Sequence, residues 1–562
     1  MMRPKAIGVL AAAALLAVPV LAGCGADQNR PLYYRTDARL STYNAASAKG
    51  NSDGVLMAFA RVQGGFNAMG PQGQTMSDRD IGEVAQQPGP VLTLRYTFSA
   101  KAVFSDGTKL SCDDLLLSWA AQSGRFKGFD AATTAGYRDI DRVDCAAGEP
   151  SATVYFLKGR DYRDWRSLFG AGTLLPAHIV AQDAGVPSVV DPIRKRDPAV
   201  LAAIAKSWNT GFDLPTGRLD PKRFVSSGPY RADSFDPKTG LRLVRNEAWW
   251  GEPAALASIV VFGRNTDTAA RAAAGGFEVT DTTAGIEPPS EKGGNPESPK
   301  IAPSAGALST EQLVLASRGP LGPPPARQAF GACVPRDQLA RSFGYGSQPW
   351  NLHVYPPAGD LADPINGQFG QRFARADILR SRDQLKQRPP GPNGEPAPPL
   401  RVRIGYLGPD NRHQQMVAAI ADSCRRAGID VVDAGSPTVS VGDLRAGKLD
   451  VLLLNSGASF AASGAAEAVR DSYSLYGGDP LNIGDFNDPA ATEAVAKFAV
   501  AEVAGDQLAL SRTMEAAAWR GLSALPLFAT PREQVWSEKL TGVISGRGRV
   551  GTGWNMDRWM RK

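Results

Sequence analysis

The sequence predicts an exported α/β protein of more than one domain. Three observations carry this prediction. The chain has 562 residues, of which 43% are hydrophobic and 21% charged, strand-like and helix-like patterns are mixed along it, and its N-terminus is typical of an exported lipoprotein. A single hydrophobic core stops growing well below this length, so we expect the chain to divide into domains.

The N-terminal segment 1–23 has the features of a bacterial lipoprotein signal peptide. Arg3 and Lys5 give it a positive start, residues 7–20 are apolar, and an LAGC lipobox ends at Cys24. The apolar run is too short to span a membrane. We expect cleavage before Cys24 and acylation of its thiol, which anchors the protein to the extracytoplasmic face of the cell membrane. Ordinary secretory cleavage, with Cys24 unmodified, is the alternative.

Charge and composition exclude several classes of protein. Losing Arg3 and Lys5 with the signal lowers the formal net charge from +6 to +4, and the charges are interspersed. We therefore expect no nucleic-acid partner. No run beyond residue 24 is long enough for a membrane helix. The three histidines are scattered and no C-x₂-C motif occurs, so we expect no metal and no cofactor.

The first part of the mature chain reads as strands around one capped helix. Residues 91–98 alternate as a strand, and Ser111 with Asp114 three residues later forms a capping-box pattern at the start of a helix. Residues 142–145 and 152–157 then read as a hairpin. Further strands are expected at 230–235, 241–245 and 258–262.

The second part alternates strands with helices. A segment rich in Pro and Gly at 388–399 predicts an exposed linker. The strand 400–406, the helix after it and the strand 429–432 form a β-α-β-like unit, and 449–454 is another buried strand. Helical periodicity occurs at 325–343, 415–427 and 490–504.

Two features of the sequence partly match those of enzymes. Gly546-x-Gly548-x-x-Gly551 matches a dinucleotide-binding pattern by letter but lacks a following helix and a later acidic residue. Ser459 is a conceivable nucleophile, with His353 or His413 as its base if the fold brings them together. No G-x-S-x-G elbow and no Walker A sequence occur, so we expect no enzyme, with a hydrolase as a minor alternative.

Two segments carry a family resemblance. Residues 103–119, VFSDGTKLSCDDLLLSW, and 226–251, SSGPYRADSFDPKTGLRLVRNEAWWG, resemble the family 5 extracellular solute-binding proteins, the peptide- and nickel-binding components of ABC importers. Weaker matches at 272–281, 326–330 and 526–528 keep the family's order. The GWNMDRW ending resembles an actinobacterial lipoprotein subgroup.

The resemblance implies a two-lobed fold of the type II periplasmic-binding-protein kind, in the large peptide-binding subclass, with a hinge between the lobes. It places a discontinuous lobe I at 25–262 plus 526–562 and lobe II at 263–525, with crossings near 261–264 and 525–530. It also implies a monomer that captures a small molecule, an oligopeptide or peptide-like ligand, and delivers it to an ABC permease. The alternative is a binding-protein fold reused as a regulatory or scaffold lipoprotein in cell-envelope assembly.

Four cysteines remain once Cys24 is acylated. An even number in an exported chain suggests two disulfides, and four cysteines allow three pairings. We favour Cys112–Cys145 and Cys333–Cys424, because each pair then falls inside one expected lobe.

The ligand site expected from the resemblance has an unusual feature. Peptide-binding relatives hold the peptide's amino group with an aspartate after the strand that corresponds to 449–454, whereas here that strand runs into a neutral loop at 455–464. Asp471 and Asp479, further along the chain, are the candidates to replace the missing aspartate. We otherwise expect recognition by neutral polar and aromatic groups. The family's ligand loops map onto Tyr43, Asn44, Asn455, Ser456, Ser459 and Phe460.

Overall fold

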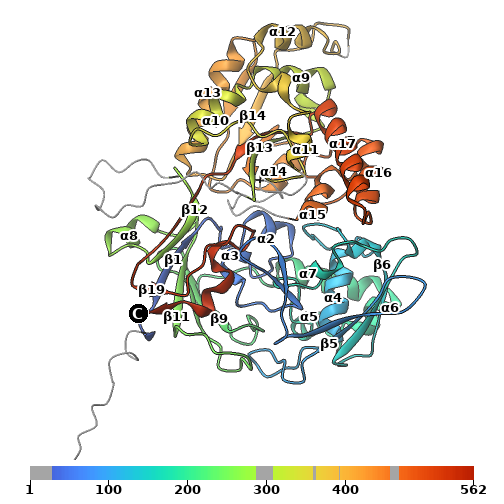
Figure 1. The fold of residues 1–562 in the computed structure, drawn as a ribbon, viewed down its shortest axis with the longest axis vertical. Coiled ribbons are helices and arrows are strands. Elements are labelled where there is room, and N and C mark those ends of the chain that lie inside the picture. The colour runs from blue at the N-terminus through green and yellow to red at the C-terminus, as the bar shows by residue number, and fades with distance from the viewer. Residues whose placement is uncertain (1–27, 287–307, 358–361, 392, 456–466) are drawn as a thin grey trace, which may run out of the picture.

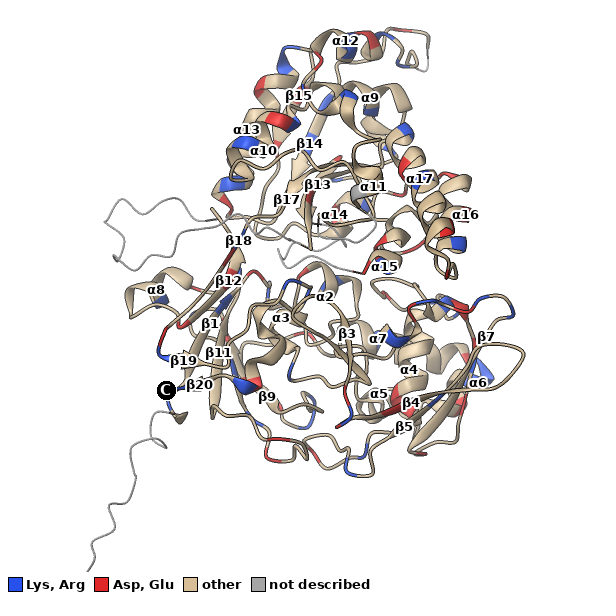
Figure 2. Cartoon of the chain, in the orientation of Figure 1, with Lys and Arg blue, Asp and Glu red and all other residues tan. Residues whose placement is uncertain are grey.

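The computed structural model describes residues 28–286, 308–357, 362–391, 393–455 and 467–562. They form two α/β lobes, one above the other in Figure 1, each built on its own sheet. Lys and Arg are interspersed with Asp and Glu over both lobes (Figure 2). In the described part of the chain, no helix has the length and apolarity needed to cross a membrane.

Lobe I is built on a seven-stranded sheet. Its central strand β1 lies parallel to β11 on one side and to β12 on the other, and every residue of β11 is buried. The predicted strands at 230–235, 241–245 and 258–262 are β9, β10 and β11. In sheet order the strands are β18 (Arg532–Trp536), β12 (Val279–Thr283), β1 (Leu32–Thr36), β11 (Ser258–Phe262), β10 (Gly240–Arg245), β9 (Tyr230–Asp236) and β8 (Gly217–Arg218).

A second, four-stranded sheet in lobe I carries the predicted capped helix. Helix α4 (Cys112–Gln122) begins with a capping box between Ser111 and Asp114. Cys112 at its start is bonded to Cys145, which follows the end of β6. The predicted hairpin is the antiparallel pair of β6 and β7. In sheet order the strands are β4 (Gly82–Gln87), β5 (Thr93–Phe98), β7 (Ser151–Phe156) and β6 (Ile140–Asp144).

Lobe II is built on a five-stranded sheet, and its core contains the second disulfide. Cys333 at the end of α9 is bonded to Cys424 in α13, and both are fully buried. The predicted β-α-β unit is β14, α13 and β15, with the two strands parallel. In sheet order the strands are β15 (Asp430–Asp433), β14 (Arg401–Gly405), β16 (Val451–Asn455), β13 (Thr310–Leu315) and β17 (Ala524–Ala529).

The remaining elements surround these sheets. Further described helices of lobe I are α2 (Ala48–Ser52), α3 (Leu56–Phe59), α5 (Ala177–Asp183), α6 (Val190–Lys195), α7 (Pro198–Thr210) and α8 (Thr268–Ala273). Those of lobe II are α9 (Pro324–Cys333), α10 (Arg336–Phe343), α11 (Asp363–Asn366), α12 (Ile378–Lys386), α13 (Asn411–Arg425), α14 (Val441–Arg445), α15 (Ala468–Ser472), α16 (Pro489–Phe498) and α17 (Ala504–Gly521). Two small two-stranded antiparallel sheets are formed by β2 (Asn67–Met69) with β3 (Thr75–Ser77), and by β19 (Leu540–Thr541) with β20 (Met560–Arg561).

The chain leaves lobe I later than the sequence analysis expected. After β11 it forms α8 and returns as β12, which pairs with β1 and β18 in the lobe I sheet. The first crossing therefore lies between Thr283 and Thr310 instead of near 261–264. The return crossing runs from the end of β17 to the start of β18 through only Thr530 and Pro531. The expected boundary between the lobes at 262/263 would divide the lobe I sheet between β11 and β12, so lobe I extends at least to Thr283.

In two places the helices are shorter than the helical periodicity of the sequence predicts. The stretch 325–343 is two helices, because Val334 is extended before Pro335, as a residue that precedes proline prefers. The stretch expected to be helical at 490–504 ends at Phe498, and α17 begins at Ala504 as a separate helix.

Candidate functional site

A small cavity of about 70 Å³ lies where the two lobes meet. Lobe I supplies most of its wall, lobe II supplies Glu467 and Arg470, and the C-terminal segment supplies Arg549. The other lining residues are Ala45, Ala46, Asn51, Leu56, Gln122, Ala132, Thr133, Ala135, Tyr137, Tyr162, Ser167, Leu168, Ala171, Gly172 and Thr173.

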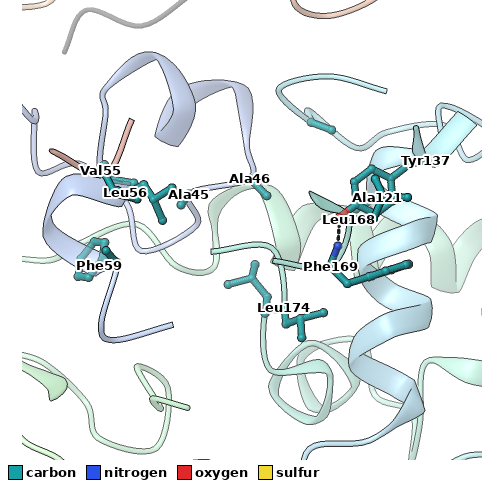
Figure 3. Close-up of a cluster of buried hydrophobic side chains, with 14 of the residues drawn as sticks. Ala45, Ala46, Val55, Leu56, Phe59, Ala121, Tyr137, Leu168, Phe169 and Leu174 are labelled. Carbon is teal, nitrogen blue, oxygen red and sulfur yellow. Dashed lines mark hydrogen bonds between the residues drawn. The ribbon is translucent and has the colours of Figure 1, made fainter. Parts of the chain in front are cut away.

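The lobe I wall of this cavity is largely apolar. Ala45 and Leu56 approach from one side, and Tyr137 and Leu168 from the other (Figure 3). The hydroxyl of Tyr137 accepts a hydrogen bond from the backbone N–H of Phe169 at 2.9 Å, which fixes the ring against the loop that carries Leu168. Burial raises the pKa of Tyr137, so the ring presents a neutral surface.

The opposite wall is charged and joins the lobes. Arg470 of α15 donates from Nη2 to Oδ1 of Asn51 in α2 at 2.6 Å, and the two helices face each other across the lobe boundary (Figure 1). Glu467 accepts from Nε of Arg549 at 2.8 Å. The side chains of Arg470 and Arg549 are only 11% and 21% exposed. Two nearly buried guanidinium groups thus lie at one small cavity.

Burial and these neighbours shift the protonation of the acidic groups in opposite directions. Burial raises the pKa of Asp471 to about 7, against the lowering effect of Arg470 at 3.4 Å. Burial also acts to raise the pKa of Glu467, but Arg549 and Arg470 outweigh it and the net shift is downward. Glu467 is therefore the carboxylate that stays ionised at this wall.

Further contacts beside the cavity hold the lobes together. The buried carboxylate of Asp479 accepts hydrogen bonds from the hydroxyl of Thr133 at 3.1 Å, and from the hydroxyl and backbone N–H of Thr134 at 2.6 and 2.9 Å. Arg163 of lobe I donates from its backbone N–H to the carbonyl of Ala499 at 2.8 Å. The structure is thus a closed arrangement of the two lobes.

The N-terminal ligand loop reaches the cavity through different residues from those expected. Tyr43 is buried among Phe59, Phe212 and Phe224, and its hydroxyl donates to the carbonyl of Val225 at 2.7 Å. Both side chains named by the sequence analysis point into the core of lobe I, since Asn44 Nδ2 donates to the carbonyl of Trp208 at 2.8 Å. Their neighbours Ala45 and Ala46 line the cavity in their place.

The second predicted ligand loop is described only at its first residue. Asn455 ends β16, is 3% exposed, and accepts a hydrogen bond on Oδ1 from the hydroxyl of Thr530 at 3.1 Å. This contact lies at the return crossing between the lobes. The expected ligand contacts at Ser456, Ser459 and Phe460, like the acylated Cys24, lie outside the described residues.

The structure places three charged residues at the cavity that no sequence motif predicted. Glu467, Arg470 and Arg549 line the cavity, so its described wall is not neutral as the sequence analysis expected. Arg549 is 79 residues beyond Arg470 in sequence, and only the fold brings the two together. Asp479, one suggested replacement for the aspartate clamp, already accepts hydrogen bonds from Thr133 and Thr134 of lobe I.

The histidines considered for catalysis already have partners in lobe II. His353 interacts through Nδ1 with Glu515 at 2.8 Å and through Nε2 with the carbonyl of Ala524 at 3.1 Å. His413 lies against Glu311 and Asp410. Among the residues that the structure describes, no three His, Cys, Asp or Glu side chains are grouped to hold a metal ion.

Comparison with known proteins gives matches over most of the chain. Residues 90–466 match the model of the bacterial extracellular solute-binding proteins, family 5 middle. An uncharacterized lipoprotein of Mycobacterium tuberculosis is 35% identical over 563 residues, covering 99% of this chain and 98% of that protein.

Solved structures with the same fold carry different ligands. OppA of Haemophilus influenzae in complex with the peptide RPPGFSPFR has a TM-score of 0.72 at 15% identity, covering 95% of this chain and 99% of that one. NikZ of Campylobacter jejuni in complex with Ni(L-His) has a TM-score of 0.67 at 12% identity, covering 94% and 99%. These likenesses establish the two-lobed type II binding-protein fold and leave the ligand open.

Proposed function

Because the chain belongs to the bacterial extracellular solute-binding proteins of family 5, we propose that it captures a small, peptide-like molecule between its lobes and delivers it to an ABC permease. In this proposal Cys24 is acylated and holds the protein on the extracytoplasmic face of the membrane. The protein itself performs no catalysis, and the importer supplies the energy of transport.

The observation that carries the proposal is the small cavity lined by both lobes. At about 70 Å³ it holds only a few water molecules, whereas ligand pockets are roughly 300–1,000 Å³. A peptide-like ligand therefore requires the lobes to separate and close again around it. The contacts of Arg470 with Asn51, of Glu467 with Arg549 and of Asp479 with Thr134 are among those that must break.

The chemistry of the charged wall supports a ligand with an anionic group. Arg549 and Arg470 are nearly buried, and an incoming carboxylate can take the place that Glu467 or Asn51 holds in the closed structure. The apolar wall formed by Leu56, Tyr137 and Leu168 suits the aliphatic or aromatic part of the same molecule.

Native mass spectrometry of the protein purified under mild conditions tests the proposal. We expect a co-purified ligand of peptide-like mass, whose occupancy falls at least about tenfold when Arg470→Gln and Arg549→Gln are combined. The matched control is Arg318→Gln, because Arg318 is 40% exposed in an ion pair with Asp485 within lobe II. A protein that carries no ligand and gains no thermal stability from any peptide would contradict capture and favour a role in envelope assembly.

A further inference from the structure

We propose that the surface around the C-terminal strand pair β19–β20 docks on the anionic bilayer to which the protein is anchored. The proposed docking face consists of Arg30, Trp536, Lys539, Ile544, Met560 and Lys562. It lies on lobe I, and none of these residues lines the interlobe cavity. The proposal rests on the lipid anchor at Cys24 and adds a defined orientation of the lobes to it.

The anchor is joined to this face by a very short connection. Gln28 donates from Nε2 to the carbonyl of Arg561 at 2.8 Å and accepts from its backbone N–H at 3.2 Å. Cys24 stands four residues before Gln28, and four extended residues reach at most about 14 Å. The short connection therefore limits how far an anchor at Cys24 can be from Gln28, which contacts β20.

The point where this connection meets the fold is firmly held. Arg561, whose side chain is 3% exposed, donates to the carbonyls of Arg30 and Pro31 at 2.8 and 3.0 Å. It also pairs with Glu278 at 2.8 Å, and Glu278 accepts from the backbone N–H of Tyr33 at 2.9 Å. The lipid is thus tied to a rigid part of lobe I.

The face presents apolar side chains to solvent. Trp536, Ile544 and Met560 are 36%, 48% and 43% exposed, and they make up three of the eight exposed large hydrophobic residues in the described part of the chain. Met560 pairs with Thr541 across the two antiparallel strands, and the carbonyl of Ile544 accepts from Trp554 at 3.0 Å. Tryptophan and apolar side chains beside a lipid anchor suit the headgroup region of a bilayer.

The charges on the face complement an anionic lipid surface. Lys539 and Lys562 are exposed and adjacent, because the backbone N–H of Lys562 donates to the carbonyl of Lys539 at 2.9 Å. The side chain of Arg30 is 63% exposed and pairs with Glu278 at 3.2 Å, and Glu538 is the exposed acid of the turn before β19, so Lys539 and Lys562 supply the positive excess. The positive excess attracts acidic headgroups at low salt, and the attraction weakens as salt is added.

Fluorescence quenching in vesicles tests the docking. The lipidated protein is placed in vesicles of phosphatidylcholine and phosphatidylglycerol, with a dye on Met560→Cys and a spin-labelled lipid as quencher. The matched control is Leu379→Cys on α12, which is 73% exposed at the far end of lobe II (Figure 1). The native cysteines of both lobes are in disulfides, so only the new thiol reacts.

We expect quenching at position 560 to exceed that at 379 at least about threefold, and to fall when Lys539→Gln and Lys562→Gln are combined or when salt is raised. Equal quenching at both positions in a protein that resists carbonate washing overturns the docking alone. A protein that washes off the vesicles overturns the anchor and the docking together. Quenching that follows protein density instead of lipid composition indicates a second copy as the occupant and overturns the proposal.

Discussion

A single carboxylate, that of Asp479, connects the lobes through three hydrogen bonds. Replacing it with Asn keeps the shape but sets an amide N–H₂ against donors from Thr133 and Thr134. We expect Asp479→Asn to weaken the closed arrangement by about 1–3 kcal/mol. Small-angle X-ray scattering measures this as a larger radius of gyration.

The matched control for this variant is Asp485→Asn. Asp485 lies in the same segment, but it is 55% exposed and pairs with Arg318 inside lobe II. We expect a change below about 0.5 kcal/mol there. If the Asp479→Asn variant and the unaltered protein have the same radius of gyration, the hydrogen bonds of Asp479 do not hold the lobes closed.

Asp471 makes stability depend on pH. Burial raises its pKa to about 7, against about 3.9 in the unfolded chain. Between pH 4 and 7 the folded protein keeps a proton that the unfolded chain has lost, so stability falls as pH rises, by up to about 1.4 kcal/mol per pH unit. Asp114, whose pKa burial also raises to about 7, contributes in the same direction.

Urea unfolding between pH 4 and 8 measures this dependence. We expect the Asp471→Asn variant to lose less stability as the pH rises, because a buried neutral amide does not ionise. Above pH 7 its free energy of unfolding should exceed that of the unaltered protein. Identical pH dependence of the two proteins would mean that Asp471 is ionised throughout this range.

Single residues were predictable from sequence only where their partners are local. Ser111 and Asp114 form the expected capping box because both of its bonds span three residues. The wall formed by Arg470 and Arg549 was not predictable, because it depends on how the C-terminal segment packs beneath lobe II. Tyr43 and Asn44 directly precede Ala45 and Ala46, which line the cavity, but the core of lobe I takes up their own side chains.

At the scale of elements, the two disulfides join helices to distant parts of the chain. They close loops of 33 and 91 residues, and on the chain-entropy model each stabilises the fold by about 3 to 5 kcal/mol. We expect Cys333→Ala with Cys424→Ala to lower the free energy of unfolding by this amount. Guanidinium titration of the double variant measures it.

Cys112→Ala with Cys145→Ala serves as the comparison, because the shorter loop predicts a slightly smaller loss. Peptide mapping without reduction that finds free thiols or another pairing would contradict the assignment of both bonds.

Strands and helices followed from the sequence wherever hydrophobic pattern and turn chemistry agree. Strands β9, β10 and β11 and the β14-α13-β15 unit were expected. Strand β12, VTDTT, carries too few apolar residues to be recognised, and it is a strand because β1 and β18 pair with both of its edges. Missing β12 shifted the expected first crossing between the lobes.

At the scale of the whole molecule, the anchor should be separable from the fold. We expect Cys24→Ala to move the protein from the membrane fraction to the soluble fraction, because two or more acyl chains supply stable anchoring. Carbonate washing followed by immunoblotting measures the distribution, and unchanged thermal unfolding of the soluble form is the control. Retention of the Cys24→Ala protein on washed membranes would rule out the lipobox.

Ligand preference is also a property of the closed molecule. Glu467, the described carboxylate that lines the cavity, and the buried Asp471 close to it in sequence each already have an arginine partner, so a free amino terminus gains no charge-assisted bond, worth roughly 1.5–3 kcal/mol. We expect calorimetry to find weak or absent binding of free di- and tripeptides, and tighter binding of longer or N-acetylated peptides. A preference for free amino termini that Asp471→Asn abolishes would show that Asp471 acts as the clamp.

The return crossing limits how the two lobes move. Only Thr530 and Pro531 separate β17 in one sheet from β18 in the other, and Arg532, the next residue, is fixed by ion pairs with Asp37 and Asp281. The proline ring fixes one of the four dihedral angles of this connector and restricts the residue before it. Such a short connector allows rotation but almost no sliding of one lobe past the other at this point. The contacts of Arg470 with Asn51 and of Asp479 with Thr134 are therefore expected to break as the lobes rotate about it.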